Sequence, residues 1–278
     1  MSARLAVAAV NLGGGFQGLM CAQIRKQLAP GETLIECAIS VPDKPEFARA
    51  RFRSLLEATP KPVALVGICI RPDDETVSAF RAAGIPVILI DEQAEGASTV
   101  ASDNFQGGYA AGRHLATVGR KSIAIVTGKM HIDGGYNALQ RAKGFQKAMN
   151  EHGLPFSLDD AIESPDYSRK DGMAAMTALL ARPRKIDAVF CAAGDACATG
   201  MLAVARERKV KVPEEIAVVG YDDSPLAAIA DPPLTTIRQS MEEIAREAHR
   251  LATSMTTQIL ASPKTVLVEP KLVVRQSA

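Results

Sequence analysis

The 278-residue sequence contains no tryptophan, and only 4% of its residues are aromatic. Its formal net charge is +1, whereas a surface that captures nucleic acid unaided usually carries a basic excess. No apolar run approaches the ~18 residues of a membrane span. The N-terminus also lacks a signal-peptide hydrophobic segment followed by a cleavage site. These shortages argue against membrane association and against DNA binding by this chain alone, and we expect a cytoplasmic protein.

Groups for covalent or metal chemistry are also scarce. The five cysteines are odd in number and lack metal-type spacing, which favours a reducing compartment. The four histidines are scattered without a partner at metal spacing, and His131 is the one in a polar turn after a strand pattern. No Tyr-x-x-x-Lys pair, G-x-S-x-G elbow, Walker A lysine or H-E-x-x-H motif is present. We therefore expect a protein that is not an enzyme and that needs neither metal nor cofactor.

The dominant pattern is an alternation of strands and helices with short connections. A first series has strand patterns at 4–10, 33–39, 62–70 and 85–90, with helical patterns at 16–28, up to 58 after a cap at Asp43, and 77–83. A second series has helices at 104–118, 137–152, 172–181 and 195–208, with strands at 122–127, near 162, 188–191 and 216–219. Such alternation predicts an α/β protein with two similar subdomains, each built on a Rossmann-like parallel sheet.

The last part of the sequence breaks this alternation. Ser240 and Glu243 fit a capping box, and the following helix places Ile244, Ala248, Leu251 and Met255 on one face. Strand patterns at 265–268 and 272–274 remain, so we expect the chain to cross between subdomains through hinge strands. The predicted boundaries are 1–103 plus about 239–268 for one subdomain, and 104–238 plus about 269–278 for the other.

The stretch from 188 to 239 contains the first candidate site. Two buried strand patterns end there in polar turns that carry Asp195 and Asp222. Ligands bind outside the carboxyl ends of strands in open parallel sheets, so both carboxylates are candidate contacts for a polar ligand. The alternatives are structural: Asp195 could be the N-cap of its helix, and Asp222 or Asp223 could simply form a turn.

Other candidates come from the remaining turns. Gly13–Gly18 matches G-x-G-x-x-G, but Glu36, the acid expected to bind ribose, lies inside a strand pattern, so a nucleotide-dependent oxidoreductase is a minor alternative. Phe16 and Tyr167 follow strand patterns and could stack on a ligand or belong to the core. Arg141 shares a helix face with apolar residues, and periodicity leaves open whether it points outward or into a cleft.

Several motifs together resemble the lac/purine repressor family (LacI/GalR type). They are Asp103–Gly112 (DNFQGGYAAG), Arg141-x-x-Gly144-Phe145, Val218–Asp223 (VVGYDD) and Pro233–Gln239 (PLTTIRQ). The resemblance implies a type I periplasmic-binding-protein fold and the effector-binding core of a homodimeric transcription regulator. Operator DNA would be bound only through an N-terminal helix-turn-helix of roughly 60 residues, which does not precede Arg4 here.

The resemblance also implies roles for individual residues. It makes Asp91, Arg141, Asp222 and Gln239 polar ligand contacts, places Phe16 and Gln17 along the cleft, and packs Tyr167 on the ligand. Asp195 corresponds to half of an Asn-Asp pair whose other position is Gly194 here; Glu92 and Gly13–Gly15 are further departures. The expected function is binding of a small polar metabolite, a sugar or sugar derivative, that allosterically controls DNA binding. The alternative is a periplasmic sugar-binding receptor.

Overall fold

The computed structural model describes residues 3–39, 45–130, 135–254 and 262–278. The chain forms two compact units: unit 1 comprises Met1–Ser102 and Ser240–Val268, and unit 2 comprises Asp103–Gln239 and Glu269–Ala278. The chain therefore passes from one unit to the other at three places. The predicted helix cap Asp43, the turn residue His131 and Met255, predicted on the apolar face of the last helix, lie outside the described residues.

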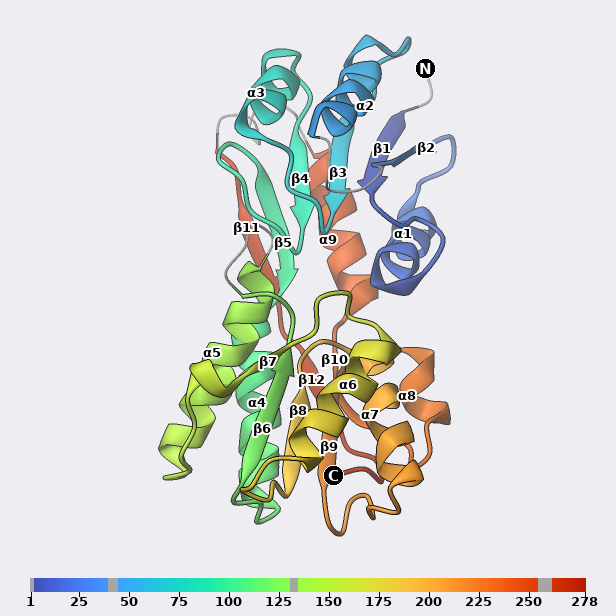
Figure 1. Cartoon of the computed structure of the whole chain (residues 1–278). Coiled ribbons are helices and arrows are strands. Elements are labelled where there is room, and N and C mark those ends of the chain that lie inside the picture. The colour runs from blue at the N-terminus through green and yellow to red at the C-terminus, as the bar shows by residue number, and fades with distance from the viewer. Residues whose placement is uncertain (1–2, 40–44, 131–134, 255–261) are drawn as a thin grey trace. The chain divides into compact units, whose positions relative to one another are not determined.

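Unit 1 is built on a six-stranded sheet in the order β11-β5-β4-β3-β1-β2, with parallel pairing throughout the described ladder (Figure 1). Four helices in the described ranges accompany it. The strands are β1 (Arg4–Ala9), β2 (Thr33–Ala38), β3 (Ala64–Ile68), β4 (Val87–Ile90), β5 (Ser98–Ser102) and β11 (Thr265–Val268), and the helices are α1 (Gly15–Gln27), α2 (Pro45–Glu57), α3 (Asp74–Ala82) and α9 (Met241–Thr253).

Both faces of this sheet are covered, which explains why β1 beyond Arg4, β3 and β4 are continuously apolar. Along β1, Leu5 and Val7 pack with α1 and α9, whereas Ala6 and Ala8 pack with α2 and α3. Successive side chains of a strand point to opposite faces, so two helical layers require apolar residues at every position. The predicted apolar face of α9 is confirmed, because Ile244, Ala248 and Leu251 are all buried.

Unit 2 repeats this arrangement with one change. Its six-stranded sheet has the order β12-β10-β9-β8-β6-β7, and β12 is antiparallel to β10. Helices α4 and α5 cover one face, and α6, α7 and α8 cover the other. The strands are β6 (Ile123–Thr127), β7 (Ile162–Glu163), β8 (Ala188–Cys191), β9 (Ala217–Asp222), β10 (Thr235–Arg238) and β12 (Lys271–Val273), and the helices are α4 (Asn104–Thr117), α5 (Tyr136–Glu151), η1 (Leu158–Asp160), α6 (Arg169–Leu180), α7 (Asp195–Glu207) and α8 (Pro225–Ile229).

The predicted α/β architecture with two parallel-type sheets is confirmed, with local corrections. Strand β5 was not predicted, because its sequence STVAS is largely small and polar although all five residues are buried. The capping box at Ser240 is wrong: Ser240 is the N-cap of α9, but its ψ of 71° is far from extended and its side chain makes no cap hydrogen bond. Glu243 instead pairs with Arg246 at 3.4 Å. A complete capping box forms at Ser168 and Asp171, at the start of α6.

Within the described part of the chain, no helix is long and apolar enough to cross a membrane.

Candidate functional site

The turn that follows β9 carries the first candidate, Asp222. The strand runs on through Tyr221, which is fully buried, and Asp222 itself is partly buried at its end. Asp222 and Asp223 both have positive φ, 103° and 52°. Non-glycine residues seldom adopt this conformation, and it concentrates at functional sites. The turn therefore holds the Asp222 carboxylate in a direction that ordinary strand geometry would not give.

Gln239, the last residue of the first segment of unit 2, is the direct partner of Asp222. Its Nε2 donates to Asp222 Oδ1 at 2.7 Å. The side chain is buried with 3% exposure, and among the described residues its Oε1 has no hydrogen-bond partner. A buried acceptor without a donor costs free energy, so this carbonyl oxygen marks a place where a donor from a ligand would be stabilising.

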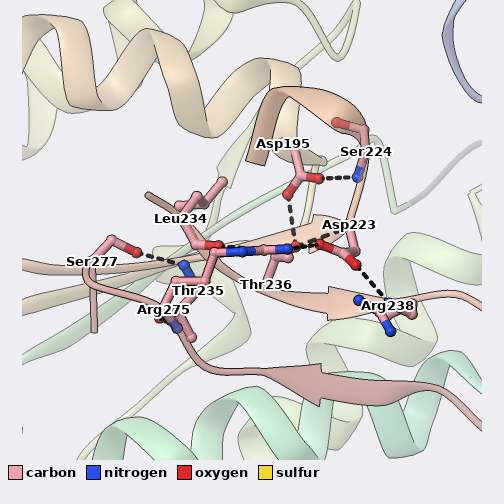
Figure 2. A network of polar contacts seen from close by, with 9 residues as sticks. All are labelled: Asp195, Asp223, Ser224, Leu234, Thr235, Thr236, Arg238, Arg275 and Ser277. Carbon is pink, nitrogen blue, oxygen red and sulfur yellow. Dashed lines mark hydrogen bonds and ion pairs between the residues drawn. The ribbon is translucent and has the colours of Figure 1, made fainter. Parts of the chain in front are cut away.

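Asp195 lies at the end of the neighbouring strand β8 and has a different environment. It is the first residue of α7, whose N-cap is Gly194, and the carboxylate does not cap the helix, so the capping interpretation is wrong. Its Oδ2 accepts from Ser224 N and its Oδ1 accepts from Thr236 Oγ1, both at 2.7 Å (Figure 2). With 1% exposure, this carboxylate joins α7 to β10 and to the turn before α8.

The two carboxylates lie beside each other because two glycines leave room for them. A Cβ on Gly194 would lie 2.9 Å from Asp222 Oδ2, and a Cβ on Gly220 would overlap Asp195 Oδ1. Gly194 also has φ of 106°, which an L-residue rarely adopts. The glycine found in place of an asparagine at 194 therefore has a structural reason, since the Asp222 carboxylate lies against its Cα.

The electrostatics of this pair follow from its burial. Desolvation raises the pKa of Asp195 to about 7, the adjacent Asp222 charge adds to this rise, and the hydrogen bonds from Thr236 and Ser224 partly oppose it. Desolvation also raises the pKa of Asp222, against the opposing influence of Arg141 and then of Gln239. Two neighbouring carboxylates in a buried site favour retention of a proton near neutral pH.

Arg141 points inward from α5. It is buried, with Nε donating to Asn104 Oδ1 at 2.7 Å and Nη1 donating to the carbonyl of Ala192 at 2.8 Å. Its guanidinium carbon lies 3.7 Å from the centroid of the Tyr221 ring, and Tyr221 Oη donates to Asn104 Oδ1 at 3.1 Å. Since its positive charge lowers the pKa of Asp222, Arg141 belongs to the same electrostatic environment as that carboxylate.

Two glycines allow α4 and α5 to approach closely enough to place Arg141. A Cβ on Gly108 would overlap the backbone carbonyl of Arg141, and a Cβ on Gly144 would overlap the carbonyl of Phe105. These glycines belong to the sequences DNFQGGYAAG and Arg-x-x-Gly-Phe. Both motifs thus have a packing reason: they bring the helix that carries Arg141 against the helix that begins at Asn104.

Tyr167 lies in the connection between β7 and α6 of unit 2. It has φ of 54° and a 44% exposed side chain, and its hydroxyl end lies against Gly128, where a Cβ would overlap it. It precedes Ser168, the N-cap of α6. The aromatic ring is therefore held over the turns after β6 and β7 and is accessible to solvent.

The candidates of unit 1 lie at the carboxyl ends of β1, β3 and β4. Gln17 Oε1 accepts from Asn11 N at 2.7 Å, and Gln17 Nε2 donates to the carbonyl of Ile68 at 3.1 Å. Phe16 is partly buried against the core, and Asp91 is buried at the end of β4 with φ of 61°. Gln17 thus contacts the carboxyl end of β3, and Asp91 follows the neighbouring strand β4, because Ile68 pairs with Ile90.

The glycine-rich turn of unit 1 does not provide the features of a dinucleotide site. Gly13 N donates to Asn11 Oδ1 at 3.1 Å, so the turn is closed by a side chain of the preceding segment. Glu36, the candidate ribose acid, lies on β2 and forms an ion pair with Arg25. The described residues also include no cluster of three or more His, Cys, Asp or Glu side chains suited to a metal ion.

Sequence reasoning missed the residues that connect the site. Asn104 and Tyr221 hold Arg141, and Thr236 and Ser224 hold Asp195. All four lie in or next to the motifs quoted above, yet none has a charge or a spacing that marks it. Their importance arises from contacts between residues up to 117 positions apart.

The comparisons with known proteins agree on one family. A periplasmic binding protein-like domain matches residues 113–278. The transcriptional regulator CelR of Thermobifida fusca is 33% identical over 214 residues, which cover 76% of this chain and 62% of CelR. The transcriptional repressor PurR of Erwinia tasmaniensis is 32% identical over 196 residues, covering 69% of this chain and 56% of PurR. The chain thus spans less than two thirds of the length of these relatives.

Solved structures agree over almost the whole chain. A LacI transcriptional regulator from a Rhodococcus species superimposes with a TM-score of 0.82 at 26% identity, covering 99% of this chain and 98% of that one. A complex of CelR with cellobiose gives a TM-score of 0.82 at 26% identity, covering 99% of this chain and 84% of that one. The chain therefore belongs to the periplasmic-binding-protein-like domain family, in the form of the effector-binding core of LacI-type regulators.

Proposed function

We propose that this protein binds a small polyhydroxylated metabolite of the sugar class and does not transform it. The observation that carries the proposal is the buried Gln239 Oε1, which has no donor among the described residues and lies on the side chain that binds Asp222. Two adjacent acceptors, an amide oxygen and a carboxylate, suit a ligand that presents neighbouring hydroxyl donors. Arg141 supplies positive charge to the same environment.

The candidates of unit 1 complete this proposal. Gln17 and Asp91 would supply polar contacts, and Phe16 and Tyr167 would pack on the apolar faces of the ligand. We propose the two units as the two lobes of the binding core. The ligand named for the CelR complex, cellobiose, supports a sugar as the class to test first.

We further propose that binding controls a DNA-binding module elsewhere in a longer protein. The curated relatives are named as transcriptional regulators and are longer than the matched region. In a cytoplasmic homodimer, a conformational change caused by ligand binding would alter the affinity of the DNA-binding modules for the operator. The size of that coupling is limited by the difference in ligand affinity between the two states.

A thermal-shift panel tests the binding proposal directly. Wild-type protein would be melted with cellobiose and other sugars, sugar phosphates, polyols, purines and NAD(P). A ligand at about 100 times its Kd adds about 2.7 kcal/mol, which raises Tm by a few degrees in a protein of this size. We expect at least one sugar to raise Tm. A response to NAD(P) alone would favour the oxidoreductase alternative, and no response to any compound would contradict the proposal.

The site assignment is tested by Asp222→Asn, which keeps the side-chain shape. It should abolish the shift given by the best ligand, because the charged acceptor is lost. Asp231→Asn is the matched control, since the Asp231 side chain is 82% exposed in the same unit. Arg141 is less suitable for truncation, because its contacts with Asn104, Ala192 and Tyr221 make it part of the packed interior. An unchanged shift in Asp222→Asn would refute the site.

A further inference from the structure

The turn that presents Asp222 needs support from outside itself. Asp222 and Asp223 are consecutive non-glycine residues with φ of 103° and 52°. Each costs conformational free energy, and such residues persist only where surrounding contacts determine the backbone. The contacts that impose this turn therefore control where the Asp222 carboxylate points.

The side chain of Asp223 is the point at which the turn is held. Its carboxylate is only 7% exposed and lies between two guanidinium groups (Figure 2). Arg238 Nε, on β10, donates to Oδ2 at 2.6 Å, and Arg275 Nη2, after β12, donates to Oδ1 at 2.6 Å. Two charge-assisted hydrogen bonds to separate oxygens fix both the position and the rotation of this carboxylate.

Arg275 is itself anchored, so it can transmit a fixed position. Its Nη1 donates to the carbonyl of Leu234 at 2.8 Å, and its backbone N donates to Thr235 Oγ1 at 2.9 Å. The next residues are tied to the sheet by Ser277, whose Oγ donates to the Val218 carbonyl at 2.6 Å and accepts from Thr235 N at 2.8 Å. The C-terminal segment is thus bound to β9 and β10.

The backbone of the turn is held on its other side by the Asp195 group. Asp223 N donates to Thr236 Oγ1 at 3.4 Å, and Ser224 N donates to Asp195 Oδ2 at 2.7 Å. The side chain of Asp223, in contrast, binds the two arginines. Loss of Arg275 would therefore release one side of the turn while leaving the Asp195 contacts available.

We propose that Arg275 is a positioning residue for Asp222, acting through Asp223 from the C-terminal segment. Its substitution would let the turn relax, and the Asp222 carboxylate would move away from Gly194 and Gln239. The inference rests on the proposed function for its effect on ligand affinity. Its effect on the turn is independent of any ligand, which allows the two to be tested separately.

Hydrogen exchange provides the ligand-free test. In Arg275→Met, which keeps an unbranched side chain without the charge, the amides of residues 222–224 should exchange about tenfold faster than in wild type. Arg120→Met is the matched control, because the Arg120 guanidinium, like that of Arg275, donates to the backbone of unit 2, here to the carbonyls of Pro213 at 2.6 Å and Glu214 at 3.4 Å, but does not bind the turn. Unchanged exchange at the turn, or equal acceleration throughout unit 2, would overturn the proposal.

Cellobiose, or the strongest sugar from the thermal-shift panel, provides the second readout by titration calorimetry. We expect Arg275→Met to weaken binding by about tenfold and Arg120→Met to leave it unchanged. Arg275→Lys keeps the ion pair with Asp223 and should recover part of the affinity. If Arg275→Met does not fold, Asp223→Asn removes the same ion pairs with a residue that tolerates positive φ. If no sugar binds wild type, the proposed function fails, while the exchange measurement still decides the role of Arg275.

Discussion

The turns after β8 and β9 lie side by side in one sheet and carry one carboxylate each, but they use it differently. Both oxygens of Asp195 accept hydrogen bonds from the protein, from Ser224 N and Thr236 Oγ1. Asp222 accepts from Gln239, and within the described residues that amide has an oxygen without a donor. Asp195 thus joins α7 to β10 and to the turn before α8, whereas the Asp222–Gln239 pair keeps an acceptor that an external donor could use.

This difference shows how one sheet edge can supply both rigidity and recognition. A buried carboxylate whose two oxygens both accept hydrogen bonds stabilises its surroundings only while the donors are present. Burial of its negative charge costs free energy. A buried acceptor without a donor costs free energy in the unliganded protein, and this cost is removed when a ligand supplies the donor. Substitutions that affect one carboxylate and spare the other test this difference.

The largest effect is expected from the charge of Asp195. Its folded-state pKa of about 7 is above its ordinary value of 3.8, so its contribution to stability is complete below about pH 4 and is lost as the pH rises through about 7. Wild-type protein should lose on the order of 3 kcal/mol of unfolding free energy across this range. Asp195→Asn, which can accept from Ser224 N and donate to Thr236 Oγ1, should remove most of that loss.

Urea unfolding at about pH 5 and about pH 8.5 measures this difference. The variant should resemble wild type at the lower pH, where Asp195 is mostly protonated, and should be the more stable protein at the higher pH. Parallel pH profiles for the two proteins would show that Asp195 does not carry the raised pKa.

An intermediate effect is expected from Thr236→Val. This nearly isosteric change removes the donor to Asp195 Oδ1, leaving a buried acceptor unsatisfied, and should lower the unfolding free energy by about 1–3 kcal/mol. Thr177→Val is the control, because the Thr177 hydroxyl donates to the Met173 carbonyl on the exposed side of α6. Equal losses in the two variants would mean that Asp195 does not depend on this hydrogen bond.

The smallest effect on stability is expected from Gln239→Leu. The change removes a donor to Asp222 but also removes the buried oxygen without a partner, so the unfolding free energy should change by less than about 1 kcal/mol. Binding of the best ligand should nevertheless be lost. Urea melts measure the unfolding free energy, and calorimetry on the same sample measures ligand affinity. A stability loss as large as that of Thr236→Val would mean that the two turns do not differ in this way.

The fold was largely predictable because burial on two sides of a sheet leaves a readable pattern. Apolar runs such as 87–90 and 188–191 match β4 and β8, and glycines mark the ends of several helices. Strand β5 was missed because its small and polar residues are buried by the elements around it, β4, β11 and α9, and give no apolar run of their own. The cap at Ser240 failed because a backbone angle, which the sequence does not encode locally, decides whether a hydroxyl reaches an amide.

The site was predictable as a set of types and positions, and less so as a set of contacts. Acidic residues at strand ends directed attention to Asp195 and Asp222. Their unequal hydrogen bonding depends on Thr236 and Gln239, which lie 41 and 17 positions away from them in sequence, respectively. Arg141 was ambiguous for the same reason, since Asn104 and Tyr221 draw it inward from a helix face that could equally have been exposed.

The sequence by itself determined the two α/β repeats, the family motifs and the glycines that those motifs require, because periodicity and backbone permissiveness are local properties. Only the tertiary structure decided which carboxylate is saturated, that Asp195 retains a proton near neutral pH, and that Arg275 holds Asp223 from the C-terminal segment. Desolvation and hydrogen bonding depend on groups that the fold assembles from distant parts of the chain, so these properties exist only once the chain has folded.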